Sequence, residues 1–378
     1  MKRYQTQIHR CFRCGYCKFP TDYSALNCPS YNRFRFDTYS TGGRLWLTYA
    51  WLKGDIPWSE HLAEILYACT TCKNCVEQCP MKFAPEIVDW IIEARSDMVE
   101  QGKIPLRVKR FLESVYNYGN PLKKTNKERL PWIKSLKKYE KGTEYLLYLG
   151  CLASYDEGTK DMVTSLVKML DKAGISYGVM GDDEQCCGNE VYAMGEMDLF
   201  KELAGKNIDK FRQLGVKSVI TICPHGYNIM KNQYQGMGYK FEVLHYSQAL
   251  AKIADDMKPK KTGNGVKITY HDPCYLGRHN KLYETPRKAL KGLELVEMPR
   301  NRKDAFCCGG GSGNFITDYL AGGNDSPARV RVREAAATGA GVLAVACPGC
   351  LLMLKEAVKT EDLDEKLQVM DIASVMGR

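Results

Sequence analysis

Two pairs of adjacent cysteines, at positions 186–187 and 307–308 and each followed by glycine, constrain this chain more than any other feature of its sequence. Adjacent cysteines do not readily close a disulfide with each other, but their two thiolates can point into one small volume. This arrangement suits an iron–sulfur centre with several metal atoms better than a single tetrahedral ion. We therefore expect metal chemistry at both pairs.

The pairs belong to a motif that occurs twice. An upstream cysteine and a downstream Cys-Pro flank each pair: Cys151 and Cys223 for the first, Cys274 and Cys347 for the second. Cys274 lies 123 residues after Cys151, and Cys347 lies 124 residues after Cys223. The near-constant separation indicates one structural unit used twice.

The length and composition indicate a globular protein of two or three domains. The chain has 378 residues, more than one core normally serves, and 44% of them are hydrophobic. No apolar run approaches the roughly 20 residues that span a bilayer, so we expect a cytoplasmic protein that reaches a membrane only through a partner. The seventeen cysteines are odd in number and clustered, which favours metal sites in a reducing compartment over a disulfide scaffold.

The net charge of +10 is spread along the chain, with a dense basic stretch over Lys123–Lys141. Such stretches often bind nucleic acid, but no nucleic-acid module signature accompanies this one. We interpret it as a solvated face or as a docking patch for an acidic redox partner.

Helical patterns dominate the first 120 residues, which we expect to form an all-α domain followed by a linker over residues 121–143. Helices are expected over residues 43–54 and 59–68 and after Pro85 and Pro105. Ser59 is in position to cap the second of these helices.

From residue 144 the pattern changes to alternating apolar strands and helices, which predicts a mostly parallel sheet covered on both faces. We expect two tandem α/β units over residues 144–256 and 266–378, joined by a linker over residues 257–265. Strands are expected over residues 144–151, 177–180, 216–223, 266–274, 293–298 and 341–347, and helices over residues 158–173 and 328–338 and from Thr285. Ligands bind outside the carboxyl ends of such strands, where these cysteines fall.

The N-terminal cysteines have the spacing of a two-cluster ferredoxin. Three cysteines of a bacterial ferredoxin run hold one cubane [4Fe-4S] cluster, and the fourth holds the other. We assign cluster one to Cys11, Cys14, Cys17 and Cys79, and cluster two to Cys28, Cys69, Cys72 and Cys75. The alternative is a pair of structural zinc sites. With helices between the triplets, the segment resembles the helical ferredoxin domain of respiratory iron–sulfur subunits.

The doubled motif, preceded by a dicluster ferredoxin, resembles the cysteine-rich subunits of heterodisulfide reductases, specifically the fused D type. The resemblance covers nearly the whole chain and extends to the iron–sulfur subunits of glycolate, lactate and anaerobic glycerol-3-phosphate dehydrogenases. It implies that a complete motif holds a noncubane [4Fe-4S] cluster at which a disulfide is split. The complete motif is the second one, with Cys274, Cys307, Cys308, Cys347 and Cys350.

The first motif lacks its fifth cysteine. Cys151, Cys186, Cys187 and Cys223 are present, but Gly226 stands where the family pattern has a cysteine. Four thiolates suffice for a cubane, so a fourth [4Fe-4S] cluster is one expectation, and an empty site is the other. His225 is either a further ligand or a hydrogen-bonding neighbour.

Two other features lie near the second motif. The glycine-rich segment over residues 309–313 has no nucleotide-binding spacing, so we expect its glycines to let backbone amides approach cluster sulfurs. His271 and Asp272 precede Cys274 and are interpreted either as proton donors and acceptors or as a strand end and a turn cap.

The resemblance implies an enzyme subunit of a heterodisulfide-reductase-like complex in anaerobic metabolism. Single electrons would pass through the two cubanes to the second Cys-Cys-Gly (CCG) motif, where a disulfide is reduced or formed. An alternative is a pure electron-transfer subunit, without a substrate, that links a flavin-containing dehydrogenase to a quinone- or ferredoxin-linked partner. A zinc-bearing structural subunit is a third reading. The expected partners are flavoprotein, ferredoxin-type or membrane cytochrome subunits and a thiol or disulfide substrate, with no nucleic acid.

Overall fold

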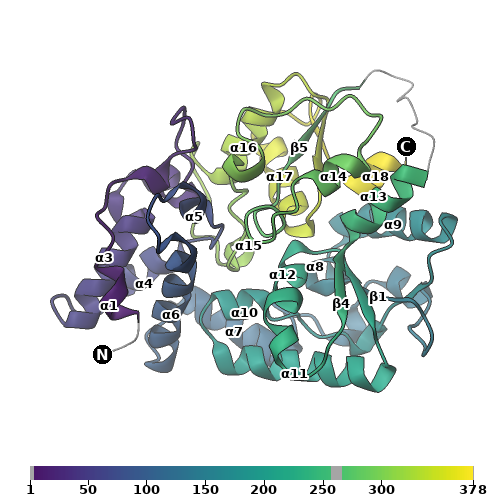
Figure 1. Ribbon diagram of the computed structural model, residues 1–378, viewed down its shortest axis with the longest axis horizontal. Helices are drawn as coiled ribbons and strands as arrows, with labels where there is room; N and C mark the ends of the chain where they lie inside the picture. The colour runs from purple at the N-terminus through teal and green to yellow at the C-terminus, as the bar shows by residue number, and fades with distance from the viewer. Residues whose placement is uncertain (1–3, 257–265, 378) are drawn as a thin grey trace.

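The computed structural model describes residues 4–256 and 266–377, and the expected linker over residues 257–265 lies outside them. Helices form the N-terminal helical part, by which we mean residues 4–135 (Figure 1). They are α1 (Gln5–Ile8), α2 (Pro29–Phe34), α3 (Thr41–Lys53), α4 (Glu60–Tyr67), α5 (Asn74–Gln78), α6 (Ile87–Glu100) and α7 (Leu106–Tyr118). Short 3-10 turns join them, at Tyr16–Lys18, Asp37–Tyr39, Ala84–Glu86, Asn126–Glu128 and Pro131–Ser135.

Side-chain caps begin two of these helices. The Ser59 side chain accepts a hydrogen bond from the Leu62 amide at 3.1 Å, so the predicted cap of α4 is confirmed. Ser40 caps α3 in the same way through the Gly43 amide at 3.2 Å. Helix α3 therefore begins two residues before the predicted start, because the polar cap lies upstream of the apolar pattern.

The first sheet has four parallel strands in the order β2-β1-β3-β4. The strands are β1 (Tyr145–Tyr148), β2 (Tyr177–Gly178), β3 (Ser218–Thr221) and β4 (Glu242–His245). Between them lie α8 (Gly150–Tyr155), the 3-10 turns Glu157–Thr159, Gly181–Asp183 and Tyr234–Gly236, α9 (Lys160–Lys172), α10 (Asn189–Ala193), α11 (Met197–Leu214) and α12 (Pro224–Asn232), with α13 (Tyr246–Asp256) after β4. We call these elements the first unit.

The second sheet has three parallel strands in the order β5-β6-β7. The strands are β5 (Ile268–His271), β6 (Val342–Val345) and β7 (Gln368–Asp371). Its helices are α14 (Glu284–Ala289), α15 (Asn314–Thr317), α16 (Pro327–Ala336), α17 (Pro348–Thr360) and α18 (Ile372–Met376), with a 3-10 turn at Arg302–Asp304. We call these elements the second unit. The predicted mixture of helices and parallel sheets is thus confirmed, while the domain boundaries stay predictions.

The strand predictions fail at three places. Strands β4 and β7 were not expected, because each mixes charged with apolar residues and neither has a continuous apolar run. The run over residues 293–298 was expected to be a strand but pairs with β5 only at Leu295, in an isolated bridge to Ile268. Its Glu297 side chain is drawn into an ion pair with Arg287 at 2.6 Å, and Pro299 follows closely.

Two buried cores hold the three parts together. One core joins the units, with Leu147 of the first sheet and Leu343 of the second among its residues. The other joins the helical part to the first unit, where Trp90 of α6 and Phe200 of α11 are both buried. Helices α8, α12 and α15 consequently lie in the middle of the molecule, where the three parts meet (Figure 1). In residues 4–256 and 266–377, no helix is long and apolar enough to cross a bilayer.

Candidate metal centres

Five predicted ligands gather at the carboxyl end of the second sheet, and we call them the second CCG set. They are Cys274, Cys307, Cys308, Cys347 and Cys350, and all five are buried. Cys274 follows β5, while Cys347 follows β6 and precedes the first turn of α17. The parallel sheet therefore delivers these thiols to the edge at which such sheets bind their ligands.

The thiols of the second CCG set form a continuous chain of contacts. Cys274 contacts Cys307, which contacts Cys308. The sulfurs of Cys308 and Cys350 lie 3.3 Å apart, and Cys350 contacts Cys347. Hydrogen bonds from Cys307 and Cys350 hold the pKa of the Cys308 thiol well below its usual value. The pKa values of Cys307 and Cys347 are lowered as well, whereas those of their neighbours Cys274 and Cys350 are raised. Three of the five thiols thus favour thiolate, the form in which cysteine binds metal.

Backbone amides also point at these sulfurs. The Gly309 amide donates to Cys307 Sγ at 3.4 Å, and the Cys350 amide donates to Cys347 Sγ at 3.5 Å. The predicted approach of a glycine amide to a sulfur is confirmed at Gly309. Gly311 serves a different purpose, because a Cβ there would lie 2.6 Å from the carbonyl oxygen of Thr70 in the helical part.

The first CCG set comprises Cys151, Cys186, Cys187 and Cys223. Cys151 lies in α8, one residue beyond the Gly150 that begins this helix, instead of at the strand end that the sequence predicts. Cys151 contacts Cys186, which contacts Cys187, and the Gly188 amide donates to Cys186 Sγ at 3.4 Å. Cys223 precedes α12 just as Cys347 precedes α17.

Gly226 faces this set. A Cβ built on Gly226 would lie 4.0 Å from Cys187 Sγ and 2.9 Å from Thr221 Oγ1. Position 226 therefore has the orientation of a fifth ligand but lacks the thiol. Thr221 occupies part of the space that a side chain would need.

His225 is held by a carboxylate. Its Nδ1 forms an ion pair with Glu190, which also accepts a hydrogen bond from the Gly313 amide of the second unit. Burial alone would lower the pKa of His225, but Glu190 outweighs it and raises the pKa to about 9. The His225 ring also lies 4.2 Å, between centroids, from that of Tyr275. These contacts make His225 a hydrogen-bonding neighbour of the set.

The two CCG sets touch each other. The Cys223 thiol contacts the Cys347 thiol across the boundary between the two units. A small cavity at this contact is lined by Cys223 and His225 from the first unit and by Cys274, Cys308, Cys347 and Cys350 from the second. Leu152 and Phe315 supply apolar walls. Cys223 of the first set and four cysteines of the second set therefore face one common space.

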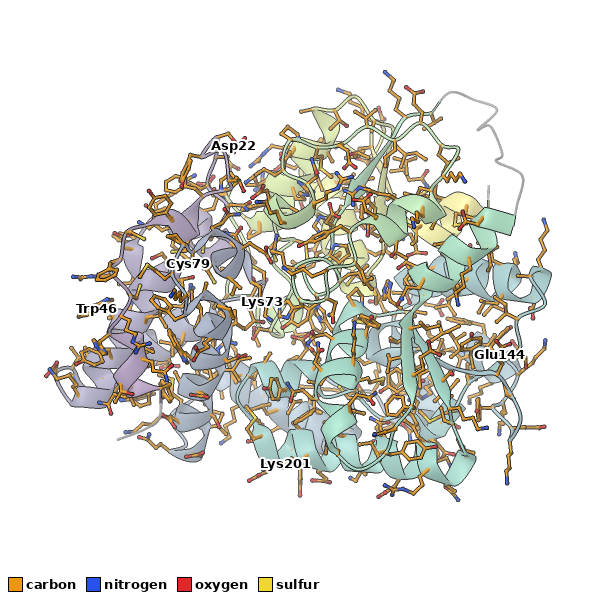
Figure 2. The ribbon with its side chains drawn as sticks, in the orientation of Figure 1. Asp22, Trp46, Lys73, Cys79, Glu144 and Lys201 are labelled. Carbon is orange, nitrogen blue, oxygen red and sulfur yellow. The ribbon has the colours of Figure 1, made fainter. Side chains whose placement is uncertain are left out.

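The N-terminal cysteines form two neighbouring groups. Cys79 lies beside Cys11 and Cys14, close enough for their charges to interact, whereas Cys28 lies beside Cys72. Both proximities agree with the crossed assignment, while Cys17 lies close to Cys28 and Cys75 as well as to Cys11 and Cys14. The assignment of ligands to the two clusters stays a prediction. Figure 2 shows Cys79 and Trp46 within the helical part and Lys73 at its border with the two units.

Cluster two and the second CCG set are in direct contact. The Cys72 thiol contacts the Cys307 thiol, and Thr70 Oγ1 lies 3.6 Å from Cys307 Sγ. The adjacent Thr71 hydroxyl lies 2.6 Å from the hydroxyl of Tyr275, the residue after Cys274. The four sets consequently follow one another in space in the order cluster one, cluster two, second CCG set and first CCG set.

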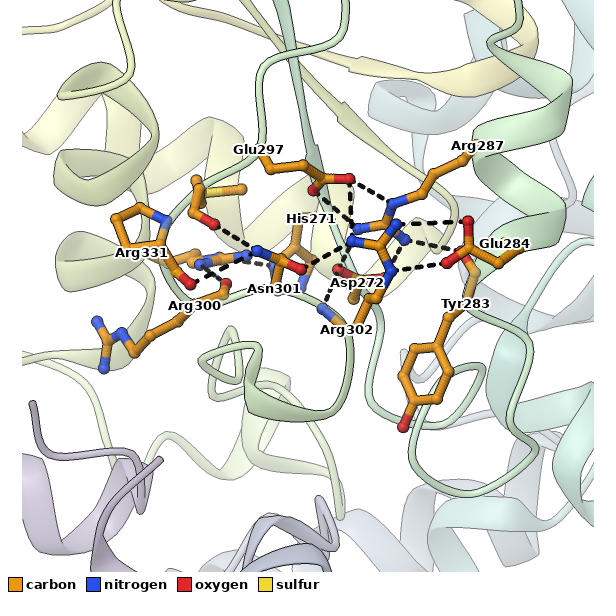
Figure 3. A network of polar contacts seen from close by, with 12 residues as sticks. His271, Asp272, Tyr283, Glu284, Arg287, Glu297, Arg300, Asn301, Arg302 and Arg331 are labelled. Atoms are coloured by element: carbon orange, nitrogen blue, oxygen red, sulfur yellow. Dashed lines mark hydrogen bonds and ion pairs between the residues drawn. The ribbon is translucent and has the colours of Figure 1, made fainter. Parts of the chain in front are cut away.

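Asp272 belongs to a buried ion-pair network (Figure 3). Its two carboxylate oxygens accept hydrogen bonds from Arg287 at 2.7 and 2.9 Å, and Oδ2 also accepts one from the Arg302 amide at 2.8 Å. The carboxylate is therefore fully engaged in holding the strand end and the loop before Cys307. The structure supports the interpretation of Asp272 as a structural residue.

His271 ends β5 close to the second CCG set, with one ring nitrogen within 4.8 Å of the sulfurs of Cys308 and Cys350. Arg331 Nε lies 3.1 Å from His271 Nδ1. Burial, followed by the charge of Arg331, lowers the pKa of His271 to about 3. The imidazole is therefore neutral at neutral pH and packs at the strand end. This agrees with the second of the two interpretations of His271 given by the sequence.

The chemistry of these donors fits iron–sulfur clusters. All seventeen cysteines are free, and Cys14 alone among them is exposed. The five sulfurs of the second CCG set exceed the four that a tetrahedral zinc ion accepts. Buried thiolates with amide donors are also the environment that tunes cluster potentials.

Several residues of the site were missed by the sequence analysis. Glu190 and Tyr275 lie next to the sets, and Arg278 donates to the Cys72 carbonyl at 2.6 Å. Arg278 is four residues from Cys274, but a single arginine has no periodicity or spacing that would indicate burial. Only the folded arrangement brings it to the cysteines of another part.

Two family models match the chain. Residues 145–231 and 268–355 each match the cysteine-rich domain CCG. Residues 7–83 match the 4Fe-4S dicluster domain. The chain is therefore an iron–sulfur protein, and the matched segments contain the predicted ligands.

Two curated relatives are much longer than this chain. The probable iron-sulfur-binding oxidoreductase FadF of Bacillus subtilis is 36% identical over 83% of this chain and 46% of its own length. The EtfAB:quinone oxidoreductase of Syntrophomonas wolfei is 35% identical over 84% of this chain and 46% of its own length. The chain thus spans about half the length of these relatives.

Heterodisulfide reductase subunits match over more of their length. The D-type subunit of the dihydromethanophenazine:CoB--CoM heterodisulfide reductase of Methanosarcina acetivorans is 30% identical over 98% of this chain and 94% of its own length. Its counterpart in Methanosarcina barkeri is 32% identical over 82% of this chain and 77% of its own length. With a dicluster domain, two CCG domains and this coverage, the chain belongs to the family of iron–sulfur oxidoreductase subunits that includes the D-type subunits of heterodisulfide reductases.

Proposed function

We propose that this chain carries single electrons from a redox partner at its N-terminal helical part to the second CCG set, where a disulfide is reduced or formed. The observation that carries the proposal is the contact between Cys72 and Cys307. It joins cluster two to the second CCG set with no residue between them. A path through the protein therefore needs no further carrier at this step.

The proposed ligands are those of the sequence analysis. A bound iron–sulfur cluster would take up and release one electron at a time. Cluster one would be held by Cys11, Cys14, Cys17 and Cys79, and cluster two by Cys28, Cys69, Cys72 and Cys75. The second CCG set would hold a noncubane [4Fe-4S] cluster, and the four cysteines of the first CCG set a further [4Fe-4S] cluster.

The surroundings of the second CCG set suit disulfide chemistry. A disulfide takes up two electrons and two protons to give two thiols. Leu152 and Phe315 line the small space between the two CCG sets together with five sulfurs. The direction of the reaction depends on the potentials of the partner and of the disulfide.

Electron uptake would take place at cluster one. Cys14 is the exposed cysteine, and aromatic side chains close to it along the chain or in space are also exposed, with Phe12 75% and Tyr23 53% accessible. Exposed apolar groups of this size mark interaction surfaces. Arg13, which lies over the Trp46 ring at 4.4 Å, adds a positive charge that would favour an acidic partner.

A pure electron relay is the second candidate, and Gly226 favours it. With four cysteines instead of five, the first CCG set is not equivalent to the second, so a mechanism that needs two equivalent clusters is weakened. The quinone oxidoreductase among the relatives is consistent with such a relay. In that role the chain would link a flavoprotein to a quinone- or ferredoxin-linked partner.

Iron analysis and EPR spectroscopy of anaerobically purified protein test the proposal. About 16 iron atoms per chain are expected if all four sets hold four iron atoms each, and about 12 if the first CCG set is empty. A paramagnetic signal that appears only when oxidant is added together with a thiol supports disulfide chemistry. Cubane signals that do not respond to thiol favour the relay, and protein with zinc in place of iron contradicts both.

A further inference from the structure

Arg278 joins the helical part to the second unit from a buried position. It lies in the loop between β5 and α14, and its side chain is 2% exposed. Nε donates to the Cys72 carbonyl at 2.6 Å, and Nη1 donates to the Lys303 carbonyl at 3.2 Å and to the Ala305 carbonyl at 2.5 Å. One guanidinium thus fastens the loop of cluster two to the segment that leads to Cys307.

No carboxylate neutralises this charge within the described part of the chain. The ion pairs found there do not include Arg278, whereas Arg287 on α14 pairs with both Asp272 and Glu297. The three groups that Arg278 binds are all neutral carbonyls. A buried guanidinium without a counter-charge is strongly unfavourable, so its compensation has to come from another source.

Cysteine side chains of two different sets lie beside this charge. The sulfurs of Cys72, Cys274 and Cys307 are close enough to Arg278 for their charges to interact with the guanidinium. Cys72 belongs to cluster two, while Cys274 and Cys307 belong to the second CCG set. The same positive charge therefore acts on both sets at their point of contact.

We propose that Arg278 is a positioning residue that sets the reduction potentials of cluster two and the second CCG set together. This inference rests on the ligand sets of the proposed function. A fixed positive charge stabilises the reduced, more negative state of a nearby centre and so raises its potential. Because Arg278 lies between the two sets, it raises both potentials together and changes the difference between them little.

Potentiometric titration followed by EPR tests this role in wild-type protein and in Arg278→Gln and Arg278→Lys. Arg278→Gln removes the charge, so both potentials are expected to fall. The ratio of reduced to oxidised centre at a fixed applied potential should drop at least tenfold, which is about 59 mV for a one-electron couple. Arg278→Lys keeps the positive charge but loses the forked set of N–H donors. The fall in potential in this variant should be less than a third of the fall in Arg278→Gln.

Arg129→Gln is a matched control. Arg129 is also buried and also binds backbone, through the Glu184 carbonyl, together with Ser154 Oγ at 2.6 Å. It lies beside the first unit, so the potential of cluster two should not change. An equal shift of cluster two in this control would show that the effect is not specific to Arg278.

The outcomes separate this inference from the function on which it rests. Wild-type protein without iron–sulfur signals overturns both. Native signals in wild type with unshifted potentials in Arg278→Gln overturn the role of Arg278 alone, and equal shifts in the Gln and Lys variants overturn the part assigned to its charge. If the Arg278→Gln variant loses iron, the Arg278→Lys variant decides the question. Near-native potentials in an Arg278→Lys variant with full iron support the proposal. Displaced potentials in that variant with full iron contradict it.

Discussion

Thr70 and Gly311 meet across the boundary between the helical part and the second unit, where the Thr70 carbonyl oxygen lies 2.6 Å from the position that a Cβ on Gly311 would take. Backbone on both sides of this contact leaves little room to relax. The close approach holds the loop of cluster two against the loop of Cys307. Glycine is required at position 311 because a larger side chain would not fit. The backbone conformation does not require glycine, since the φ angle of Gly311 lies outside the left-handed region.

Gly311→Ala should therefore destabilise this junction. Forcing one methyl group into packed structure costs about 1–3 kcal/mol, so a lower midpoint of thermal unfolding is expected. Gly205→Ala is the control, because a Cβ at Gly205 in α11 would meet nothing within 4 Å. An unchanged midpoint for Gly311→Ala would mean that the two loops can move apart at little cost.

A cysteine at position 226 should complete the first CCG set. Thr221 Oγ1 would lie 2.9 Å from the new Cβ. In the second unit Val345 takes the place of Thr221, as Cys350 takes the place of Gly226. The variant therefore combines Thr221→Val with Gly226→Cys. The EPR spectrum of the first set should change towards that of the second. Gly226→Ala fills the same space without a thiol and should leave the spectrum as in wild type.

Removing the fifth sulfur of the second CCG set should have the opposite effect. Cys350→Ser takes away the thiol that lies 3.3 Å from Cys308 Sγ. We expect the thiol-dependent EPR signal to disappear while the signals of the two N-terminal clusters persist. Retention of the wild-type spectrum and turnover would exclude Cys350 from the centre.

Electron uptake should depend on the charge of Arg13. Arg13→Glu places a negative charge beside exposed Cys14, so reduction by an acidic flavodoxin should slow about tenfold at low ionic strength and recover partly at high salt. Stopped-flow absorbance measures the rate. Lys201→Glu makes the same charge change on α11, far from Cys79 and Trp46 in Figure 2, and should leave the rate unaltered.

Stability should fall with rising pH because of Asp371. Burial raises the pKa of Asp371 to about 7, and its carboxylate accepts hydrogen bonds from the Tyr246 hydroxyl and from the Ala373 amide at 2.8 Å. Between about pH 4 and 7 the native state holds this proton while the unfolded chain has lost it. The free energy of unfolding therefore decreases over this range, by up to about 4 kcal/mol, and levels off above it.

Asp371→Asn removes this titration. The Asn oxygen can still accept from the Ala373 amide, and the Asn nitrogen can donate to the Tyr246 oxygen. Urea unfolding at pH 5 and pH 8 should give a smaller difference for the variant than for wild type. Equal differences in the two proteins would show that Asp371 does not titrate in this range.

The sequence predicts those parts of the molecule that have a local signature. Cysteine spacing locates the sets, and apolar runs locate strands such as β3 and β6, because both depend on neighbours along the chain. Strands β4 and β7 escape prediction since their stability comes from pairing with an already formed sheet. The contacts of Cys72 with Cys307 and of Cys223 with Cys347 join segments more than 100 residues apart, and no local pattern encodes them.

The order of the four sets in space differs from their order along the chain. The second CCG set, encoded last, lies between cluster two and the first CCG set. In the proposed path the second CCG set receives electrons from cluster two, and the first CCG set lies beyond it. The missing ligand at Gly226 leaves the contact between cluster two and the second CCG set intact. A comparable loss at Cys307 would break that contact, and electrons from cluster two would reach neither CCG set.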